Sequence, residues 1–279
     1  MSKNLIARIA VAAVAIPAIL WVCYQGGNWL KGMLVFFSIV AMVEFLYNEK
    51  IKFSQPVYWL FVLAMLISLT QNLQLNFLWT NWVVLSAKTD KILLFLLVAG
   101  MFFSVGKESP AELFSKYTRL FWGFLYISVL YPMVFALSTF GTDSYLGGDL
   151  LLFLFGLLWV GDSAAMFGGK AFGKHKLAPS VSPNKTVEGF ISGIIGALII
   201  GVVMYYWKLE AIGLTHLLII SLGCSIFGQL GDLVESMWKR SLNIKDSSAI
   251  IPGHGGILDR FDSLLFATPF ICYYLLYII

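Results

Sequence analysis

Long apolar stretches recur along the whole chain and alternate with short polar segments. A helix needs about 20 residues to cross roughly 30 Å of hydrocarbon. The apolar stretches that approach this length lie near residues 5–24, 29–47, 57–75, 91–106, 119–140, 149–169, 187–207, 214–234 and 262–279. The fourth is short and residues 76–90 are ambiguous, so the pattern predicts an all-α, polytopic bundle of about nine transmembrane helices.

The chain shows no internal repeat and no low-complexity linker. We therefore expect a single integral membrane domain over residues 1–279, with amino-terminal spans in 1–155 and the polar motifs in 156–279. The basic start followed by an apolar run resembles a signal peptide, but it lacks a clear small-residue cleavage site. We interpret it as the first retained helix.

Composition supports a membrane protein. Hydrophobic residues make up 59% of the chain and charged residues 12%, whereas soluble domains average about 45–50% and about 25%. The small net charge of +4, without a clustered basic face, argues against nucleic-acid binding. The three cysteines lie in apolar runs without metal-ligand spacing, which indicates small buried residues.

The distribution of Lys and Arg predicts an orientation. With the amino terminus in the cytoplasm and the spans alternating, 15 of the 19 Lys and Arg residues fall in inner segments. The four exceptions are Lys31, Lys88, Lys91 and Lys208. Because cytoplasmic loops are enriched in these residues, we expect the polar loops 170–186 and 235–261 on the cytoplasmic side.

Carboxylates stand at the ends of several predicted spans, although a charge within a membrane helix costs about 2.5–3.5 kcal/mol. Asp162 closes the sixth span, Asp232 and Glu235 close the eighth, and Asp259 and Asp262 open the ninth. Such acids repel one another unless a cation lies between them. Oxygen ligands without a His or Cys cluster suit Mg²⁺.

The eighth span also places its polar residues on one face. Asp232, Glu235, Ser236 and Lys239 follow the spacing i, i+3, i+4 and i+7, which is one side of a helix.

Cations and a glycine-rich segment accompany these acids. The cations are Lys185, Lys239, Arg240, Lys245 and Arg260, and the segment Pro252–Gly256 contains His254, Gly255 and Gly256. Glycines let backbone N–H groups approach an anion closely. Together these features predict metal-assisted phosphoryl or nucleotidyl transfer, without a Walker or Rossmann motif.

Each feature also has a simpler interpretation. Intramembrane carboxylates can line the ion pathway of a transporter, and basic helix ends usually anchor topology. The glycine-rich segment can be an ordinary turn, His254 can cap a helix end, and Asp162 can be a packing hydrogen-bonder. Only the whole cluster favours an enzyme.

The segment 236–262 resembles the signature of phosphatidate cytidylyltransferases at every defined position, from Ser236 and Lys239-Arg240 through Lys245-Asp246 to His254-Gly-Gly and Asp259-Arg-x-Asp262. Segments 231–236, 182–189 and 161–165 resemble further motifs of that family, although Met166 stands where an aromatic residue is expected. The resemblance covers roughly residues 156–270, and the amino-terminal half matches only in hydrophobic character.

The resemblance implies that CTP and phosphatidate react to give CDP-diacylglycerol and pyrophosphate, with Mg²⁺ in a two-metal or mixed-metal site. It implies Asp232, Asp259 and Asp262 as metal ligands, supported by Glu235 and Asp246. Lys239, Arg240, Lys245 and Arg260 would bind phosphates, and Lys185 and Asp162 would complete the cavity. On this view Asp259 lies at an exposed helix end, and Asp259→Asn abolishes activity with little loss of stability.

The family also implies a bacterial inner-membrane enzyme whose site faces the cytoplasm and takes the lipid from the bilayer. A CTP-dependent polyprenol or phytol kinase is the alternative among enzymes, and a cation-coupled transporter is the alternative outside them. Acids at helix ends rather than near the bilayer midplane favour an enzyme. A homodimer is compatible with amino-terminal spans that have no other evident role.

Overall fold

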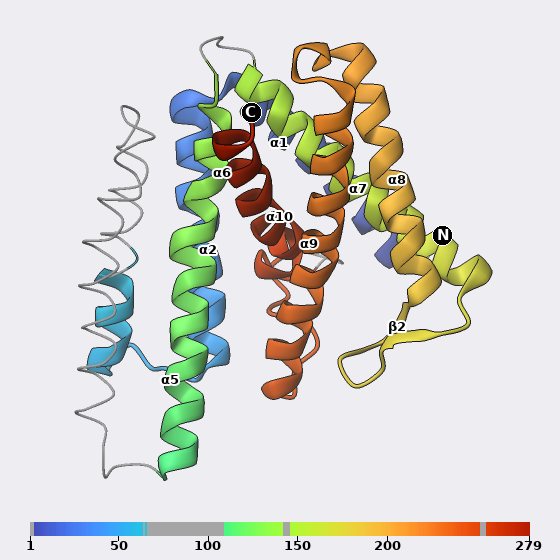
Figure 1. Ribbon diagram of the computed structural model, residues 1–279. Helices are drawn as coiled ribbons and strands as arrows, with labels where there is room; N and C mark the ends of the chain where they lie inside the picture. Colours follow the sequence, from blue (N-terminus) through green and yellow to red (C-terminus); the bar gives the residue numbers. More distant parts are fainter. Residues whose placement is uncertain (1–2, 64, 66–108, 142–145, 252–254) are drawn as a thin grey trace. The chain divides into compact units, whose positions relative to one another are not determined.

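The computed structural model describes residues 3–63, 65, 109–141, 146–251 and 255–279, with backbone only for residues 3–10. This part of the chain is mostly helical (Figure 1). Residues 56–63 are helical, and the α-helices with both ends described are α1 (Lys3–Gln25), α2 (Gly27–Asn48), α5 (Pro110–Phe124), α6 (Leu130–Ser138), α7 (Leu146–Phe172), α8 (Val187–Trp207), α9 (Leu214–Ser241) and α10 (Leu258–Tyr277). A π-helical turn, η1 (Leu125–Val129), joins α5 to α6, and a 3₁₀ turn, η2 (Glu210–Ile212), precedes α9.

Five helices of the described residues are long and apolar enough to cross a membrane. They are α2, the continuous helix Pro110–Ser138, α7, α8 and α9. The chain is therefore a multi-pass membrane protein. The predicted span 187–207 coincides with α8, whereas the predicted span 91–106 and most of 57–75 lie outside the described residues.

Helix α10 occupies the position of the ninth predicted span but is not among the five. Its first turns contain Asp259, Arg260 and Asp262, which lower the hydropathy of an otherwise apolar helix. The total of nine spans stays a prediction.

The chain divides into two compact units, residues 1–30 with 133–279 and residues 31–132. In the first unit, α7 packs along α8, and α9 packs against both α8 and α10. Small residues permit the close approach: a Cβ on Gly196 would lie 2.7 Å from the Cβ of Ala164. Such packing is typical of membrane helix pairs, which associate at small residues.

The second unit has an aromatic core. Phe45 of α2 stacks on Phe61, with ring centroids 5.8 Å apart, and Trp122 stacks on Tyr126 at 4.8 Å. The buried carboxylate of Glu49 accepts two hydrogen bonds from Arg119 Nε, at 2.9 and 3.0 Å. This pairing satisfies a charge that would otherwise be costly to bury.

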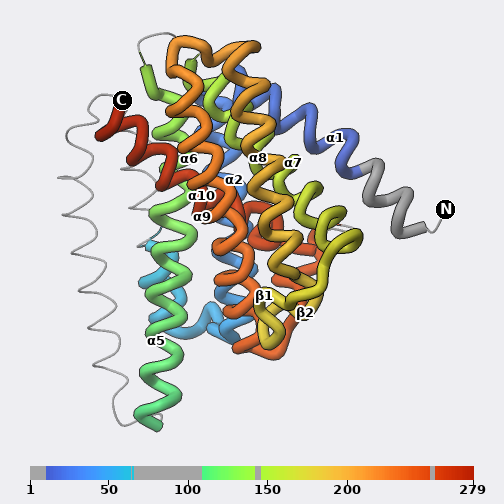
Figure 2. Tube along the Cα trace, turned by 45° about the vertical axis from the view of Figure 1, so that its right-hand side comes forward, coloured from blue at the N-terminus to red at the C-terminus, as the bar shows by residue number. Residues whose placement is uncertain are grey.

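A β-hairpin interrupts the helices between α7 and α8. Strands β1 (Lys176–Ala178) and β2 (Ser182–Thr186) pair antiparallel, with Lys176 opposite Thr186 and Ala178 opposite Ser182. It lies where α8 begins and α9 ends (Figures 1 and 2). The all-α prediction missed it because the segment is polar and its strands are too short for an alternating pattern.

Candidate active site

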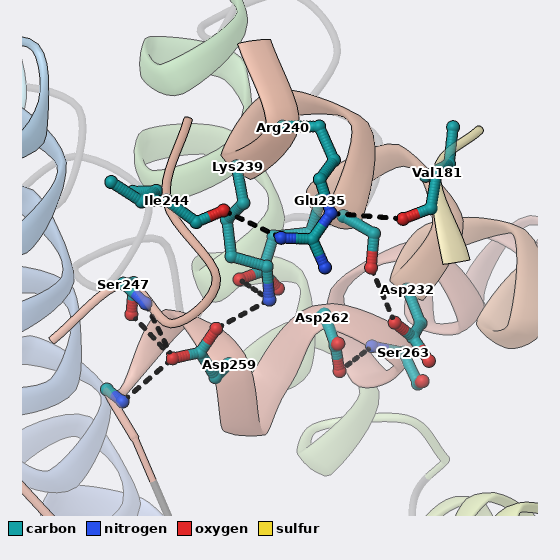
Figure 3. Close-up of polar contacts among 12 residues, drawn as sticks. Val181, Asp232, Glu235, Lys239, Arg240, Ile244, Ser247, Asp259, Asp262 and Ser263 are labelled. Carbon is teal, nitrogen blue, oxygen red and sulfur yellow. Dashed lines mark hydrogen bonds and ion pairs between the residues drawn. The ribbon is translucent and has the colours of Figure 1, made fainter. Parts of the chain in front are cut away.

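The carboxyl-terminal half of α9 carries a row of polar side chains on one face, as the spacing predicts. Ser236 Oγ donates to Asp232 Oδ1 at 3.3 Å, and Lys239 Nζ lies 3.3 Å from Glu235 Oε1. Glu235 is fully buried, whereas the Asp232 side chain is 33% exposed. The face therefore runs from an accessible carboxylate to a buried ion pair (Figure 3).

The ammonium of Lys239 joins α9 to α10. Its Nζ lies 2.6 Å from Asp259 Oδ1, and the side chains of both residues are less than 10% exposed. Glu235, Lys239 and Asp259 thus form a buried triad in which one cation lies between two carboxylates. Because Lys239 is enclosed by these partners, it is poorly placed for the phosphate binding that the resemblance implies.

The other oxygen of Asp259 closes the loop that precedes α10. Asp259 Oδ2 accepts hydrogen bonds from Ser247 N at 2.8 Å, Ser247 Oγ at 2.9 Å and Gly256 N at 2.8 Å. Ser247 and Gly256 begin and end this loop, so one carboxylate oxygen fastens both ends (Figure 3). Asp259 is 8% exposed, which corrects the expectation of an exposed helix end.

Two glycines of the segment predicted to bind an anion, Gly255 and Gly256, have structural roles in this loop. Gly255 has a φ of +83°, and a Cβ there would lie 2.7 Å from Asp259 Oδ2, so both conformation and space require glycine. The N–H of Gly256 already donates to Asp259 and is not free for an anion. His254 lies outside the described residues.

Asp232 meets a cation from the hairpin. Lys185 Nζ on β2 lies 2.6 Å from Asp232 Oδ2, and the two side chains are 27% and 33% exposed. The pair is thus open to solvent, unlike Lys239 and Asp259. The pair places Lys185, from the polar loop 170–186, beside the face of α9 that carries Asp232 and Glu235.

Asp262 and Asp162 complete the acidic group. Asp262 Oδ1 accepts a hydrogen bond from Ser263 N at 2.7 Å, and the negative charges of Asp232 and Asp162 act on this carboxylate. The positive charges of Lys185 and Arg260 act on the Asp162 carboxylate through space, without an ion pair to either cation among the described residues. Because α7 continues to Phe172, Asp162 lies within a helix, whereas the sequence pattern placed it at the end of a span.

The remaining cations differ in how they are held. Arg240 Nε donates to Val181 O at 3.2 Å and its Nη1 to Ile244 O at 2.8 Å, and its third nitrogen points away from both carbonyls (Figure 3). Arg260 and Lys245 are exposed, and neither side chain has a hydrogen bond or ion pair within the described part of the chain.

The predicted support residues of the metal differ from each other. Glu235 is buried beside Lys239, whereas Asp246 is exposed on the turn after α9, near Gly255. Within the described ranges, no three His, Cys, Asp or Glu side chains are gathered into a ready metal site. Asp232 and Asp262 each keep carboxylate oxygen capacity, and one or two carboxylates with substrate phosphates suffice for Mg²⁺. Asp259 has no such remaining capacity for a metal ion, because its two carboxylate oxygens already accept four hydrogen bonds.

Sequence reasoning missed two residues that organise the site. Ser247 binds Asp259 through both its backbone N–H and its hydroxyl, and Glu188 binds the backbone where the hairpin begins. Both lie inside segments that resemble family motifs, which was the available signal. Nothing in their spacing indicates which partner they meet.

Comparison with known proteins identifies the family of the chain. The model of the cytidylyltransferase family matches residues 6–278. A phosphatidate cytidylyltransferase of Staphylococcus haemolyticus is 35% identical over 263 residues, covering 94% of this chain and 95% of that protein. One from Bacillus subtilis is 55% identical over 120 residues, 43% of this chain and 44% of that protein. Since the match extends over almost the whole chain and reaches both the helices and the polar cluster, the chain belongs to the cytidylyltransferase family.

Proposed function

We propose that the chain transfers the cytidylyl group of CTP to phosphatidate, forming CDP-diacylglycerol and pyrophosphate. The observation that carries the proposal is a polar site, built on membrane helices, that combines accessible carboxylates with exposed cations. Asp232 is partly exposed, and Arg260 and Lys245 are exposed without hydrogen bonds or ion pairs among the described residues. The full-length relatives are named for this reaction.

The chemistry asks for positioning more than for a strong base. A phosphate oxygen of phosphatidate attacks the α-phosphorus of CTP, and the bond from that phosphorus to the bridging oxygen of the β-phosphate breaks. Pyrophosphate leaves with the bonding electron pair. Because the attacking phosphate is already an anion, the protein must chiefly hold two polyanions in line and offset their charge.

The exposed cations are suited to the phosphates. Within the described part of the chain, Arg260 and Lys245 have no ion pair to give up, and Arg240 makes its two backbone contacts through Nε and Nη1 alone. A guanidinium binds phosphate with a planar pair of donors. Lys185 stands beside Asp232, where it can contact a phosphate that approaches this carboxylate.

Asp232 and Asp262 are the residues that we expect to hold Mg²⁺, with Asp162 near both. When bound, Mg²⁺ neutralises charge on the triphosphate and on the leaving pyrophosphate. Asp259 supports the site indirectly, by holding Lys239 and both ends of the loop before α10. Whether the site takes one metal ion or two is decided by metal titration of the purified protein.

The site would face the cytoplasm of a bacterial inner membrane, with the amino terminus inside. The support is the excess of Lys and Arg in the segments assigned to that side. CTP would arrive from the cytoplasm and phosphatidate from the bilayer, which a site at helix ends can serve together. We further expect a homodimer, to be tested by the mass of the protein in detergent.

The test is incorporation of labelled CTP into lipid by purified protein with phosphatidate, with and without Mg²⁺. Mg²⁺-dependent CDP-diacylglycerol with equal pyrophosphate is the expected result. Release of CDP with a phosphorylated lipid would instead indicate a CTP-dependent lipid kinase. Folded protein that turns over no lipid acceptor would return the transporter interpretation to first place.

A further inference from the structure

The β1–β2 hairpin is attached to the helices by side chains at its base, its tip and its second strand. These attachments are Glu188 at the base, Arg240 at the tip and Lys185 on β2. Short hairpins are marginal on their own in water. The position of this hairpin therefore depends on these attachments and on the helices that flank it.

Glu188, in the first turn of α8, fastens the base. Its carboxylate accepts hydrogen bonds from the backbone N–H of Lys174 at 3.0 Å and of His175 at 3.2 and 3.3 Å. His175 Nδ1 lies 2.7 Å from Glu188 Oε1. Residues 174 and 175 lead directly into β1, so Glu188 holds the beginning of the hairpin against the beginning of α8.

The tip is fastened by α9. Val181, in the turn between the strands, accepts a hydrogen bond from Arg240 Nε, and the same guanidinium donates to Ile244 O after α9. The turn is also closed internally, from Val181 N to Ala178 O at 3.1 Å. The hairpin is thus held at its base and at its turn. These two attachments fix the position of the side chains on the strands between them.

Lys185, a proposed phosphate-binding residue, lies on the second strand of this hairpin. It lies on β2, one residue before Thr186, which pairs with Lys176 and caps α8. Its ammonium reaches Asp232 Oδ2 at 2.6 Å on a different helix. A shift of the hairpin would move this ammonium relative to Asp232 without altering either residue.

We propose that Glu188 is a positioning residue, which sets Lys185 beside Asp232 by fixing the base of the hairpin. Glu188 directs its carboxylate to the backbone of residues 174 and 175 and acts on the reaction only through Lys185. The proposal rests on the proposed function, because the consequence of misplacing Lys185 is weaker handling of a substrate phosphate.

The test is a double-mutant cycle on kcat/KM with wild type, Glu188→Gln, Lys185→Ala and the double variant. Displacement of a positioning group by about 1 Å costs up to about 100-fold in rate, so we expect Glu188→Gln to lower kcat/KM roughly 10-fold. In the Lys185→Ala background the same change should cost less than about twofold, since residues that act as a unit are non-additive. An equal loss in both backgrounds would overturn the proposal.

Two further variants separate this role from charge and from general stability. Glu188→Asp keeps the charge but shortens the reach to residues 174 and 175, and we expect it to behave like Glu188→Gln; full activity would overturn the proposal. Glu210→Gln, an exposed carboxylate in η2, is the matched control and should match wild type.

The rate of amide hydrogen exchange at residues 176–186 in substrate-free protein tests the attachment of the hairpin independently of turnover. We expect faster exchange in Glu188→Gln, and protection equal to wild type would overturn the proposal. Wild-type protein that forms no CDP-diacylglycerol would contradict the proposed function while leaving the exchange result to decide on the hairpin.

Discussion

Asp259→Asn is expected to destabilise the protein strongly, which separates a structural anchor from an open metal ligand. In the native site the carboxylate accepts four hydrogen bonds, one of them from a buried ammonium. Asparagine has one acceptor oxygen and one NH₂ group, so it cannot accept from both Lys239 and the loop donors. Either Lys239 faces an NH₂ group or the loop loses its anchor.

The expected loss follows from these contacts. A hydrogen bond to a charged group contributes about 1.5–3 kcal/mol, and a neutral one about half as much. Losing the Lys239 contact and weakening the three loop bonds therefore predicts a decrease of about 3–5 kcal/mol in the free energy of unfolding, the range for breaking a buried ion pair. The expectation of little stability loss, made from sequence, assumed that this residue was exposed.

Asp262→Asn is the matched control, because Asp262 lies one turn later on the same helix. Its Oδ1 accepts a hydrogen bond from the N–H of Ser263, and an asparagine oxygen can accept the same bond. We expect a change in unfolding free energy within about 1 kcal/mol, together with loss of Mg²⁺-dependent turnover.

Denaturant titration of both variants in detergent, followed by tryptophan fluorescence, measures the difference. An Asp259→Asn protein as stable as wild type would refute the anchoring role. Equal destabilisation by Asp262→Asn would refute the contrast between the two carboxylates.

Other substitutions test the remaining contacts. Lys185→Ala should raise the KM of at least one substrate roughly tenfold, the equivalent of about 1.4 kcal/mol, with an unchanged unfolding curve; an unchanged KM for both would remove Lys185 from the site. Gly255→Ala should destabilise by about 1–3 kcal/mol, because alanine would be strained at this φ and would press on Asp259; differential scanning calorimetry checks it. Ser247→Ala removes the hydroxyl bond to Asp259 and should cost about 1.5–3 kcal/mol in the same measurement. Arg260→Gln should lower kcat/KM for CTP or phosphatidate without a stability change, since its guanidinium has no hydrogen bond or ion pair among the described residues.

The helices could be predicted from sequence because the membrane imposes one simple requirement. A span must be apolar over about 20 residues, and the segment 187–207 meets it along its whole length, as α8 does in the structure. The predicted spans 149–169 and 214–234 stop short of the ends of α7 and α9, since both helices continue beyond their apolar part, to Phe172 and Ser241. Helical hydrogen bonding does not require apolar side chains, so hydropathy marks the apolar part and not the helix end.

The site was predictable along a single helix but not between elements. The spacing of Asp232, Glu235 and Lys239 follows from helical geometry alone. That Lys239 is buried against Asp259, 20 residues later, depends on how α9 packs on α10, which no local pattern encodes. The motif therefore named candidate site residues without separating those in accessible positions from those that are buried in contacts with one another.

That separation follows from the cost of burying charge. An acidic site in a membrane protein must be stable before substrate arrives, so some of its carboxylates need cations of their own. Lys239 serves this need where burial is deepest, between Glu235 and Asp259, and such a cation cannot leave for a phosphate without leaving two buried carboxylates uncompensated. Lys185 offsets Asp232 at a partly exposed position, where exchange for a substrate or a metal ion costs far less. We therefore expect the accessibility of each ion pair, more than the identity of its residues, to determine which cations are available for the reaction.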